Sequence, residues 1–150
     1  MEDARELRAF YDDSYSHAGE AAERYGRWRA LGALRKADHV IELCARARVR
    51  PARTLDIGCG DGALLGELAR RGFGGWLEGL EITPAAVEIA ARREGIGRVA
   101  LYDGVHIPAT NGAYDVAILS HVLEHVPEPA SLLAEVGRAC AHVVIEVPLE

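Results

Sequence analysis

The sequence is poor in cysteine and has no long uninterrupted apolar run. Its 150 residues include only Cys44, Cys59 and Cys140, and no two of them have CxxC spacing. This pattern encodes neither a disulfide framework nor a zinc knuckle, and it suits a reducing cytoplasm. No apolar stretch approaches the roughly 20 residues that cross a bilayer, and the acidic N-terminus lacks the apolar core of a signal peptide. We therefore expect a cytoplasmic protein without a membrane segment.

Basic residues are in the minority. The chain has 17 Lys and Arg against 23 Asp and Glu, a formal net charge of -6, which disfavours binding to a phosphate backbone. The densest basic segment, residues 46–53, lies at an expected helix end, where the helix dipole already favours cations. Nucleic acid is therefore not expected as a partner. With 49% hydrophobic residues, the chain can form the core of one domain.

One amphipathic helix is expected near the N-terminus, between Trp28 and Arg48, and Arg50 and Pro51 end it. Its predicted buried face consists of apolar residues at steps of three and four, namely Leu31, Leu34, Ala37, Ile41 and Cys44. Residues 1–50 as a whole are predicted to form a helical arm or lid.

The remaining residues, 51–150, alternate between short apolar runs and helix-period segments. The expected strands are 53–58, 76–82, 99–103, 114–120 and 143–147. Thr83 and Pro84 mark a helix start. Strands that alternate with helices imply parallel pairing through crossovers. We therefore predict a Rossmann-like α/β fold with an open, mostly parallel sheet, helices on both faces, and a ligand site at the carboxyl ends of the strands.

A glycine-rich loop, Asp56-Ile57-Gly58-Cys59-Gly60-Asp61-Gly62, joins the first strand to its helix. It loosely matches the dinucleotide pattern, in which a pyrophosphate sits at the helix N-terminus. Asp56 and Asp61 would repel that group, by about 4 kcal/mol for each close pair of unit charges at an effective dielectric of about 20. S-adenosylmethionine carries an ammonium and a sulfonium instead, and Asp56 could bind the ammonium directly or through water. The alternative is a tight turn in which Asp61 only caps the helix.

Two further acidic residues follow the next strands. Glu81 lies 19 residues after Gly62, where an acidic side chain can accept both ribose hydroxyls of an adenosyl ligand. Asp103 could accept from the adenine amino group, although Asp103-Gly104 is also a common turn sequence.

Together, LDIGCGDG, LEGLEI, LYDG and YDVAILSHVLEHV resemble the successive motifs of class I S-adenosylmethionine-dependent methyltransferases, and the small bacterial type 11 enzymes look most similar. The resemblance covers residues 53–148. It implies that Gly58 and Gly60, with Cys59 between them, line the methionine part of the cofactor. It also assigns the ribose, the adenine and the floor of the site to Glu81, Ile82, Asp103, Gly104, Ser120 and His121.

In this family the sheet normally continues past the fifth strand with a helix and an antiparallel pair, whereas this sequence ends at Glu150. We expect the C-terminal strands of the fold to be missing, through truncation or disorder, which leaves the strand at 143–147 with an unpaired edge.

His121, Glu124 and His125 match the HxxEH pattern of some zinc proteases. A zinc site is not expected, because Pro127 allows at most a short turn here and no third ligand stands out. His121 or His125 could instead act as a general base, or both could simply shape the pocket or cap the next helix.

The N-terminal arm carries Tyr11, Tyr15, Arg24 and Arg27, which could close over the cofactor or lie in solvent. The predicted function is methyl transfer from S-adenosylmethionine to an oxygen or nitrogen of a small molecule, with S-adenosylhomocysteine as the product. Two alternatives stay open: a module that binds the cofactor without catalysis, and an NAD-dependent oxidoreductase. The sequence leaves the substrate and the oligomeric state open.

Overall fold

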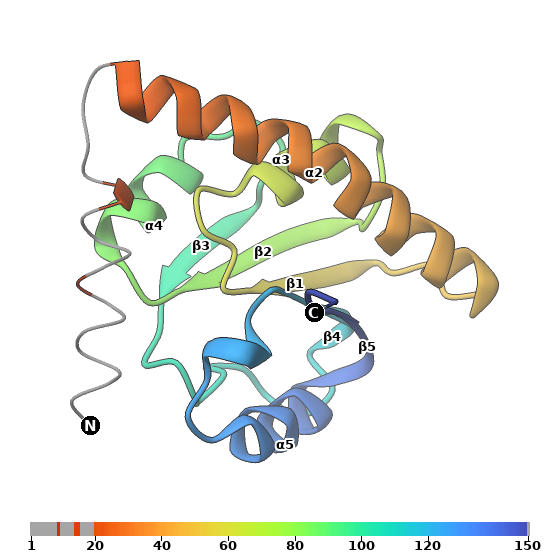
Figure 1. The fold of residues 1–150 in the computed structure, drawn as a ribbon. Helices are drawn as coiled ribbons and strands as arrows, with labels where there is room; N and C mark the ends of the chain where they lie inside the picture. The colour runs from red at the N-terminus through yellow and green to blue at the C-terminus, as the bar shows by residue number, and fades with distance from the viewer. Residues whose placement is uncertain (1–8, 10–13, 16–19, 150) are drawn as a thin grey trace.

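Five parallel strands form one open sheet in the computed structural model, which describes residues 9, 14, 15 and 20–149. The strands lie in the order β3-β2-β1-β4-β5, and every neighbouring pair is parallel. Their bounds are β1 Arg53–Ile57, β2 Trp76–Glu81, β3 Arg98–Leu101, β4 Tyr114–Ser120 and β5 Cys140–Glu146. The helices are α2 Glu20–Arg46, α3 Ala63–Arg70, α4 Pro84–Ala90 and α5 Pro129–Ala139, with a 3-10 turn, η1, at Leu123–His125 (Figure 1).

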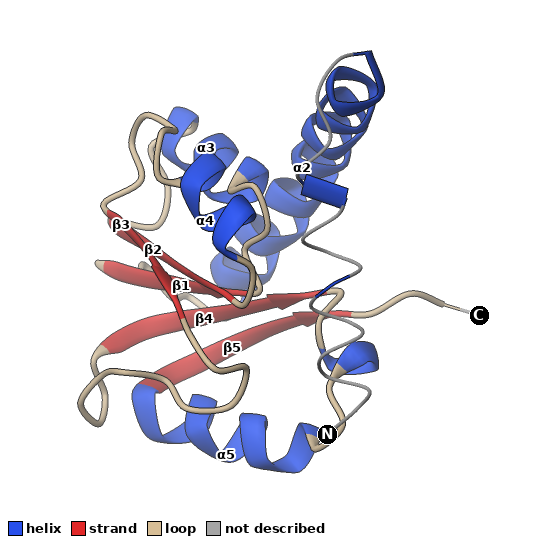
Figure 2. Ribbon diagram, turned by 90° about the vertical axis from the view of Figure 1, so that its left-hand side faces the viewer, coloured by secondary structure: helices blue, strands red, loops and turns tan. Residues whose placement is uncertain are grey.

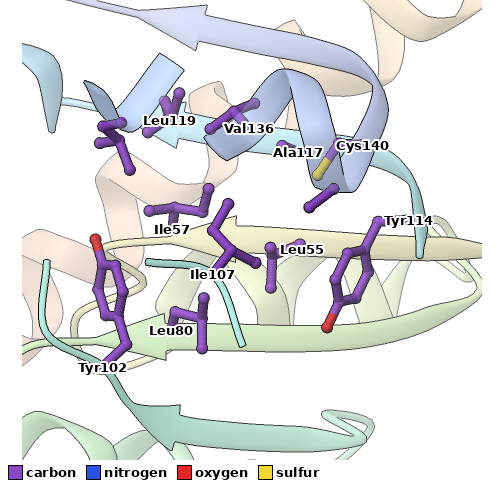
Figure 3. Packing of buried hydrophobic residues seen from close by; sticks show 12 residues of the cluster. Leu55, Ile57, Leu80, Tyr102, Ile107, Tyr114, Ala117, Leu119, Val136 and Cys140 are labelled. Carbon is purple, nitrogen blue, oxygen red and sulfur yellow. The ribbon is translucent and has the colours of Figure 1, made fainter. Parts of the chain in front are cut away.

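Helices cover both faces of the sheet, as Figure 2 shows: α2, α3 and α4 lie on one face and α5 on the other. Side chains of β4 alternate between the two layers, as the two-residue period of a strand requires. Val116 and Ile118 join the core under α2 and α3, whereas Ala117 and Leu119 join the core over α5. Figure 3 shows this second core, in which Leu119 and Val136 pack near Ile57. The predicted fold class is confirmed, and the sheet is wholly parallel in the described residues.

The predicted buried face of the long helix is partly wrong. Leu31 is 66% exposed and Leu34 is 40% exposed, whereas the buried residues of α2 are Ala33, Ala37, Val40 and Cys44. These four also follow steps of four, three and four, so periodicity alone cannot choose between the two adjacent stripes. Ala37, Val40 and Cys44 belong to the same core cluster as the buried leucines of α3, and this packing sets the rotation of α2.

Two strand ends also differ from the sequence prediction. Strand β5 begins at Cys140, directly after α5, rather than at residue 143, and β3 ends at Leu101 rather than at residue 103. Within the described residues β5 pairs only with β4 and lies at one edge of the sheet. None of the described helices combines the length and apolar character needed to cross a bilayer.

Candidate functional site

The glycine loop lies at the carboxyl end of β1, beside the end of β2. Gly58, Gly60 and Gly62 have φ values of 70°, 54° and 73°, a region that side-chain-bearing residues rarely adopt. A Cβ atom on Gly58 would also lie 2.7 Å from Val122. The backbone N–H groups of Gly58 and Cys59 donate to the Leu80 carbonyl at 2.8 and 3.1 Å, which fixes the loop against β2. The loop therefore presents bare backbone toward the edge of the sheet where ligands bind in such folds.

Asp56, the penultimate residue of β1, carries a buried carboxylate. It is 3% exposed, and no described residue donates to its side chain. Burial raises the pKa of Asp56 to about 7, opposed by the charge of Lys36 and reinforced by that of Glu81. Buried polar groups in native proteins nearly always have a partner. Because no described residue supplies a donor, the Asp56 carboxylate can accept a hydrogen bond from a ligand or from water.

Glu81 holds the glycine loop and the β2–α4 turn together. Its Oε2 accepts from the Gly60 N–H at 2.8 Å, and its Oε1 accepts from the N–H groups of Ile82 and Thr83 at 2.7 and 3.1 Å. The residue is 6% exposed. Each carboxylate oxygen has two lone pairs, so Oε2 can accept one more hydrogen bond. The sequence placed Glu81 at a strand end, but its role in fixing the loop was not predicted.

Asp61 does not face a ligand as a free carboxylate. Its Oδ2 lies 2.8 Å from Nε of Arg29 and 3.3 Å from Nη2 of Arg93, and its Oδ1 accepts from the Ala63 N–H at 3.1 Å. The expectation that Asp61 would repel a pyrophosphate as an unpaired charge is therefore wrong, since two guanidinium groups neutralise it. Neither arginine was singled out from the sequence. Arg29 is 32 residues from Asp61 in the sequence, and no local pattern predicts a contact over that separation.

The N-terminal arm reaches the glycine loop through Tyr15. A Cβ atom on Gly60 would lie 2.6 Å from the Tyr15 hydroxyl, and the guanidinium of Arg29 stacks 4.9 Å from the centre of the Tyr15 ring. Arg24 and Arg27, the arginines named from the sequence, are exposed. Tyr11 lies outside the described residues. The arm thus meets the loop through a different arginine from those predicted.

Ile82 and Gly104 bring the ends of β2 and β3 together, since a Cβ atom on Gly104 would lie 3.6 Å from Ile82. Asp103 closes a turn: its Oδ1 accepts from the N–H groups of Val105 and His106 at 2.8 and 2.7 Å, and its Oδ2 lies 2.6 Å from Nδ1 of His106. The His106 imidazole, with these N–H groups, lowers the pKa of Asp103 to about 2. This geometry matches the turn alternative for Asp103-Gly104.

The end of β4 carries the histidine candidates. The His121 backbone is in the left-handed region, with a φ of 57°, and its Nδ1 lies 3.3 Å from Oε1 of Glu124. His125 lies on the short turn η1, as the sequence suggested. Among the described residues no group of three His, Cys, Asp or Glu side chains is placed to hold a metal ion. Glu146, which was not predicted, accepts from the Ser120 hydroxyl at 3.0 Å.

The arginine cluster around Asp61 supports a stability prediction. We expect Asp61→Asn to lower the free energy of unfolding by about 2 kcal/mol, because it leaves two partly buried guanidinium groups without their counter-charge. Solvent reaches both arginines and keeps the loss below that of a fully buried pair. Urea denaturation would measure it. Asp38→Asn is the control: its side chain is 63% exposed and pairs with Arg71, so it should cost no more than about 0.5 kcal/mol. Equal losses for both variants would contradict the assignment.

In the part of the chain that the structure describes, an open, all-parallel α/β sheet with a glycine loop after its first strand defines a Rossmann-like fold class. Residues 25–150 match the family described as "Methyltransferase domain". The chain belongs to this family, as a class I S-adenosylmethionine-dependent methyltransferase domain.

Among curated proteins, the chain is similar to ubiquinone biosynthesis O-methyltransferases. It is 33% identical to that of Neisseria meningitidis serogroup C over 104 residues, which covers 65% of this chain and 42% of the relative. It is 37% identical to that of Serratia proteamaculans over 95 residues, covering 60% and 37%. The chain thus spans less than half the length of these relatives.

Solved structures share the fold. A plantazolicin methyltransferase in complex with S-adenosylhomocysteine has a TM-score of 0.68 at 16% identity, covering 96% of this chain and 61% of that one. A possible histamine N-methyltransferase from Thermotoga maritima has a TM-score of 0.64 at 21% identity, covering 82% and 56%. The [4+2]-cyclase SpnF has a TM-score of 0.53 at 27% identity, covering 59% and 34%.

Proposed function

We propose that the chain binds S-adenosylmethionine at the glycine loop and serves methyl transfer to an oxygen or nitrogen of a small molecule in the cytoplasm. The observation that carries the proposal is the buried Asp56 carboxylate, which has no donor among the described residues. The ammonium of the cofactor supplies the missing donor and the missing positive charge together. A phosphate would instead meet a second negative charge in a desolvated place, so the same residue disfavours a dinucleotide.

Other residues beside the glycine loop, at the carboxyl ends of β2 and β3, fit an adenosyl group. The remaining lone pair on Oε2 of Glu81 is a ribose acceptor, and Ile82 with Gly104 forms a narrow apolar contact for adenine. Oδ2 of Asp103 contacts Nδ1 of His106 and has a second lone pair that can accept from the adenine amino group. Cys59 packs its thiol against Gly79, so it would meet the cofactor through its backbone. Arg29 is the arm residue placed to bind the cofactor carboxylate, in competition with Asp61.

The bound cofactor supplies an electrophilic methyl group, and the chain's own residues must position the acceptor and manage its proton. Glu124 lies beside Nδ1 of His121, which can orient the imidazole so that Nε2 accepts a proton from the acceptor atom. His125 is the second candidate base. Ser120 is held by Glu146 and lines the floor of the site. The similarity to O-methyltransferases favours an oxygen acceptor.

A cofactor-binding module without methyl transfer is the second candidate. The observation that favours it is the shared fold of a [4+2]-cyclase, an enzyme named for a cyclisation rather than for methyl transfer. In this case the site would bind the cofactor and the chemistry would lie elsewhere.

Ligand-dependent stability tests the proposal. S-adenosylhomocysteine at 100 times its Kd should stabilise the chain by about 2.7 kcal/mol, seen as a rise in Tm, and NAD should have no effect. The reverse pattern would overturn the proposal in favour of an oxidoreductase. Binding of S-adenosylmethionine without transfer of a labelled methyl group to any oxygen or nitrogen acceptor would favour the non-catalytic module.

A further inference from the structure

A hollow of about 540 Å³ lies at the opposite edge of the sheet from the glycine loop. It is formed where α2 ends and where the α3–β2 connection passes, and it is lined by Ile41, Ala45, Arg48, Val49, Arg50 and Phe73. Strand β1 begins at Arg53, three residues after Arg50. The glycine loop follows the far end of that strand, about 16 Å away at roughly 3.3 Å per residue. The hollow is therefore separate from the cofactor site.

The lining combines apolar side chains with the guanidinium groups of Arg48 and Arg50. Ile41, Val49 and Phe73 are partly buried, whereas Arg48 and Arg50 are exposed. Neither of these two arginines has a carboxylate partner among the described residues. Other arginines nearby are paired: Arg46 with Glu42 at 3.9 Å, Arg53 with Glu78 at 3.3 Å, and Arg71 with Glu67 at 2.7 Å. A ligand that complements this lining has an anionic group next to the arginines and an apolar part on the apolar side chains.

Arg48 also has an unusual backbone. It lies just past the end of α2 with a φ of 58°. Its N–H donates to the Ala45 carbonyl at 3.0 Å and the Val49 N–H donates to the Cys44 carbonyl at 2.8 Å, the pattern of a helix end that normally uses glycine. A strained non-glycine residue is an observation from which function can be inferred. Here the strained residue places a guanidinium at the rim of the hollow.

We infer that this hollow binds a small amphipathic acid. Its apolar tail would pack on Ile41, Val49 and Phe73, and its carboxylate would lie between Arg48 and Arg50. The volume is within the range of about 300–1,000 Å³ that small-molecule sites occupy. This site does not depend on the proposed methyltransferase function, because none of its lining residues lies in the glycine loop or at the carboxyl ends of the strands.

Titration of the full chain with decanoate, below its micelle concentration, tests the inference by isothermal calorimetry. Decanol, which has the same chain length without the charge, should bind at least tenfold more weakly. Saturating S-adenosylhomocysteine should leave decanoate affinity unchanged, since the two sites are separate. Absence of decanoate binding, equal binding of decanol, or competition between decanoate and S-adenosylhomocysteine would each overturn the inference.

Arg48→Gly is the decisive variant, because glycine suits the backbone at this position and the variant should fold with an unchanged or higher Tm. It should lower decanoate affinity at least tenfold. Arg46→Ala is the matched control: Arg46 is on the same helix end but does not line the hollow. It should leave the affinity unchanged. An unchanged affinity in Arg48→Gly, or an equal loss in both variants, would show that general surface charge, not this site, holds the acid.

Discussion

At pH 8, Asp56→Asn is expected to bind S-adenosylhomocysteine at least 30-fold more weakly than the unchanged chain. The proposed contact joins the ligand's ammonium to a carboxylate that is 3% exposed. Removing one partner of such a desolvated, hydrogen-bonded charge pair costs about 2 kcal/mol or more, which corresponds to roughly 30-fold in Kd. Isothermal calorimetry at pH 8 would measure both constants.

The same contact predicts how affinity changes with pH. With an Asp56 pKa of about 7 in the free chain, the carboxyl group is mostly protonated at pH 6 and mostly ionised at pH 8. Since the ammonium requires the ionised form, the Kd of the unchanged chain should be about tenfold larger at pH 6 than at pH 8. Binding near pH 6 should also release a proton, detectable as a buffer-dependent heat. Asp56→Asn should show neither effect.

Stability of the free chain provides an independent check with a defined sign. Folding raises the pKa of Asp56 from about 3.8 to about 7. The contribution of this group to the free energy of unfolding is therefore fully present below pH 3.8 and is lost as pH rises through about 7. Asp56→Asn should therefore be more stable than the unchanged chain at pH 8 without ligand, although it binds ligand more weakly. A variant that is less stable and binds equally well would mean that Asp56 is a structural residue.

Glu81→Ala should weaken S-adenosylhomocysteine binding at least tenfold, about 1.4 kcal/mol. It should also lower the free energy of unfolding by about 3 kcal/mol, because three backbone N–H groups, two of them in the β2–α4 turn, lose their acceptor. Calorimetric titration and urea denaturation would give the two quantities separately. Glu88→Ala is the control: this exposed α4 residue pairs with Arg92 and should change neither quantity appreciably.

Glu81→Gln separates the structural role of Glu81 from the ligand contact. Its amide oxygen can still accept from the Ile82 and Thr83 N–H groups, so much of the lost stability should return. The amide NH₂ cannot accept from Gly60 or from ribose, so the affinity should stay low. Full recovery of both quantities in Glu81→Gln, or an unchanged Kd in Glu81→Ala, would place the ribose elsewhere.

Much of the fold was predictable because its signals are local. The short apolar runs, the glycine loop and the Thr83-Pro84 helix start each act over a few residues, and the strands that the apolar runs predict are present. The predicted position of the candidate site rests on the same local signals, because parallel strands place their carboxyl ends at one side of the sheet. Local signals were weaker at element ends, as the early start of β5 shows.

The residue sequence by itself therefore determined an α/β chain with a glycine loop and acidic residues at the ends of its strands. Only the tertiary structure decided which of those acids is available. It paired Asp61 with Arg29 and Arg93, turned Asp103 toward its own backbone and gave Glu81 three N–H donors. It left Asp56 buried, with no donor from any residue that the structure describes. The reason is physical: a hydrogen bond between residues 32 positions apart depends on how α2 is rotated and packed, and the apolar period of that helix was compatible with two adjacent faces.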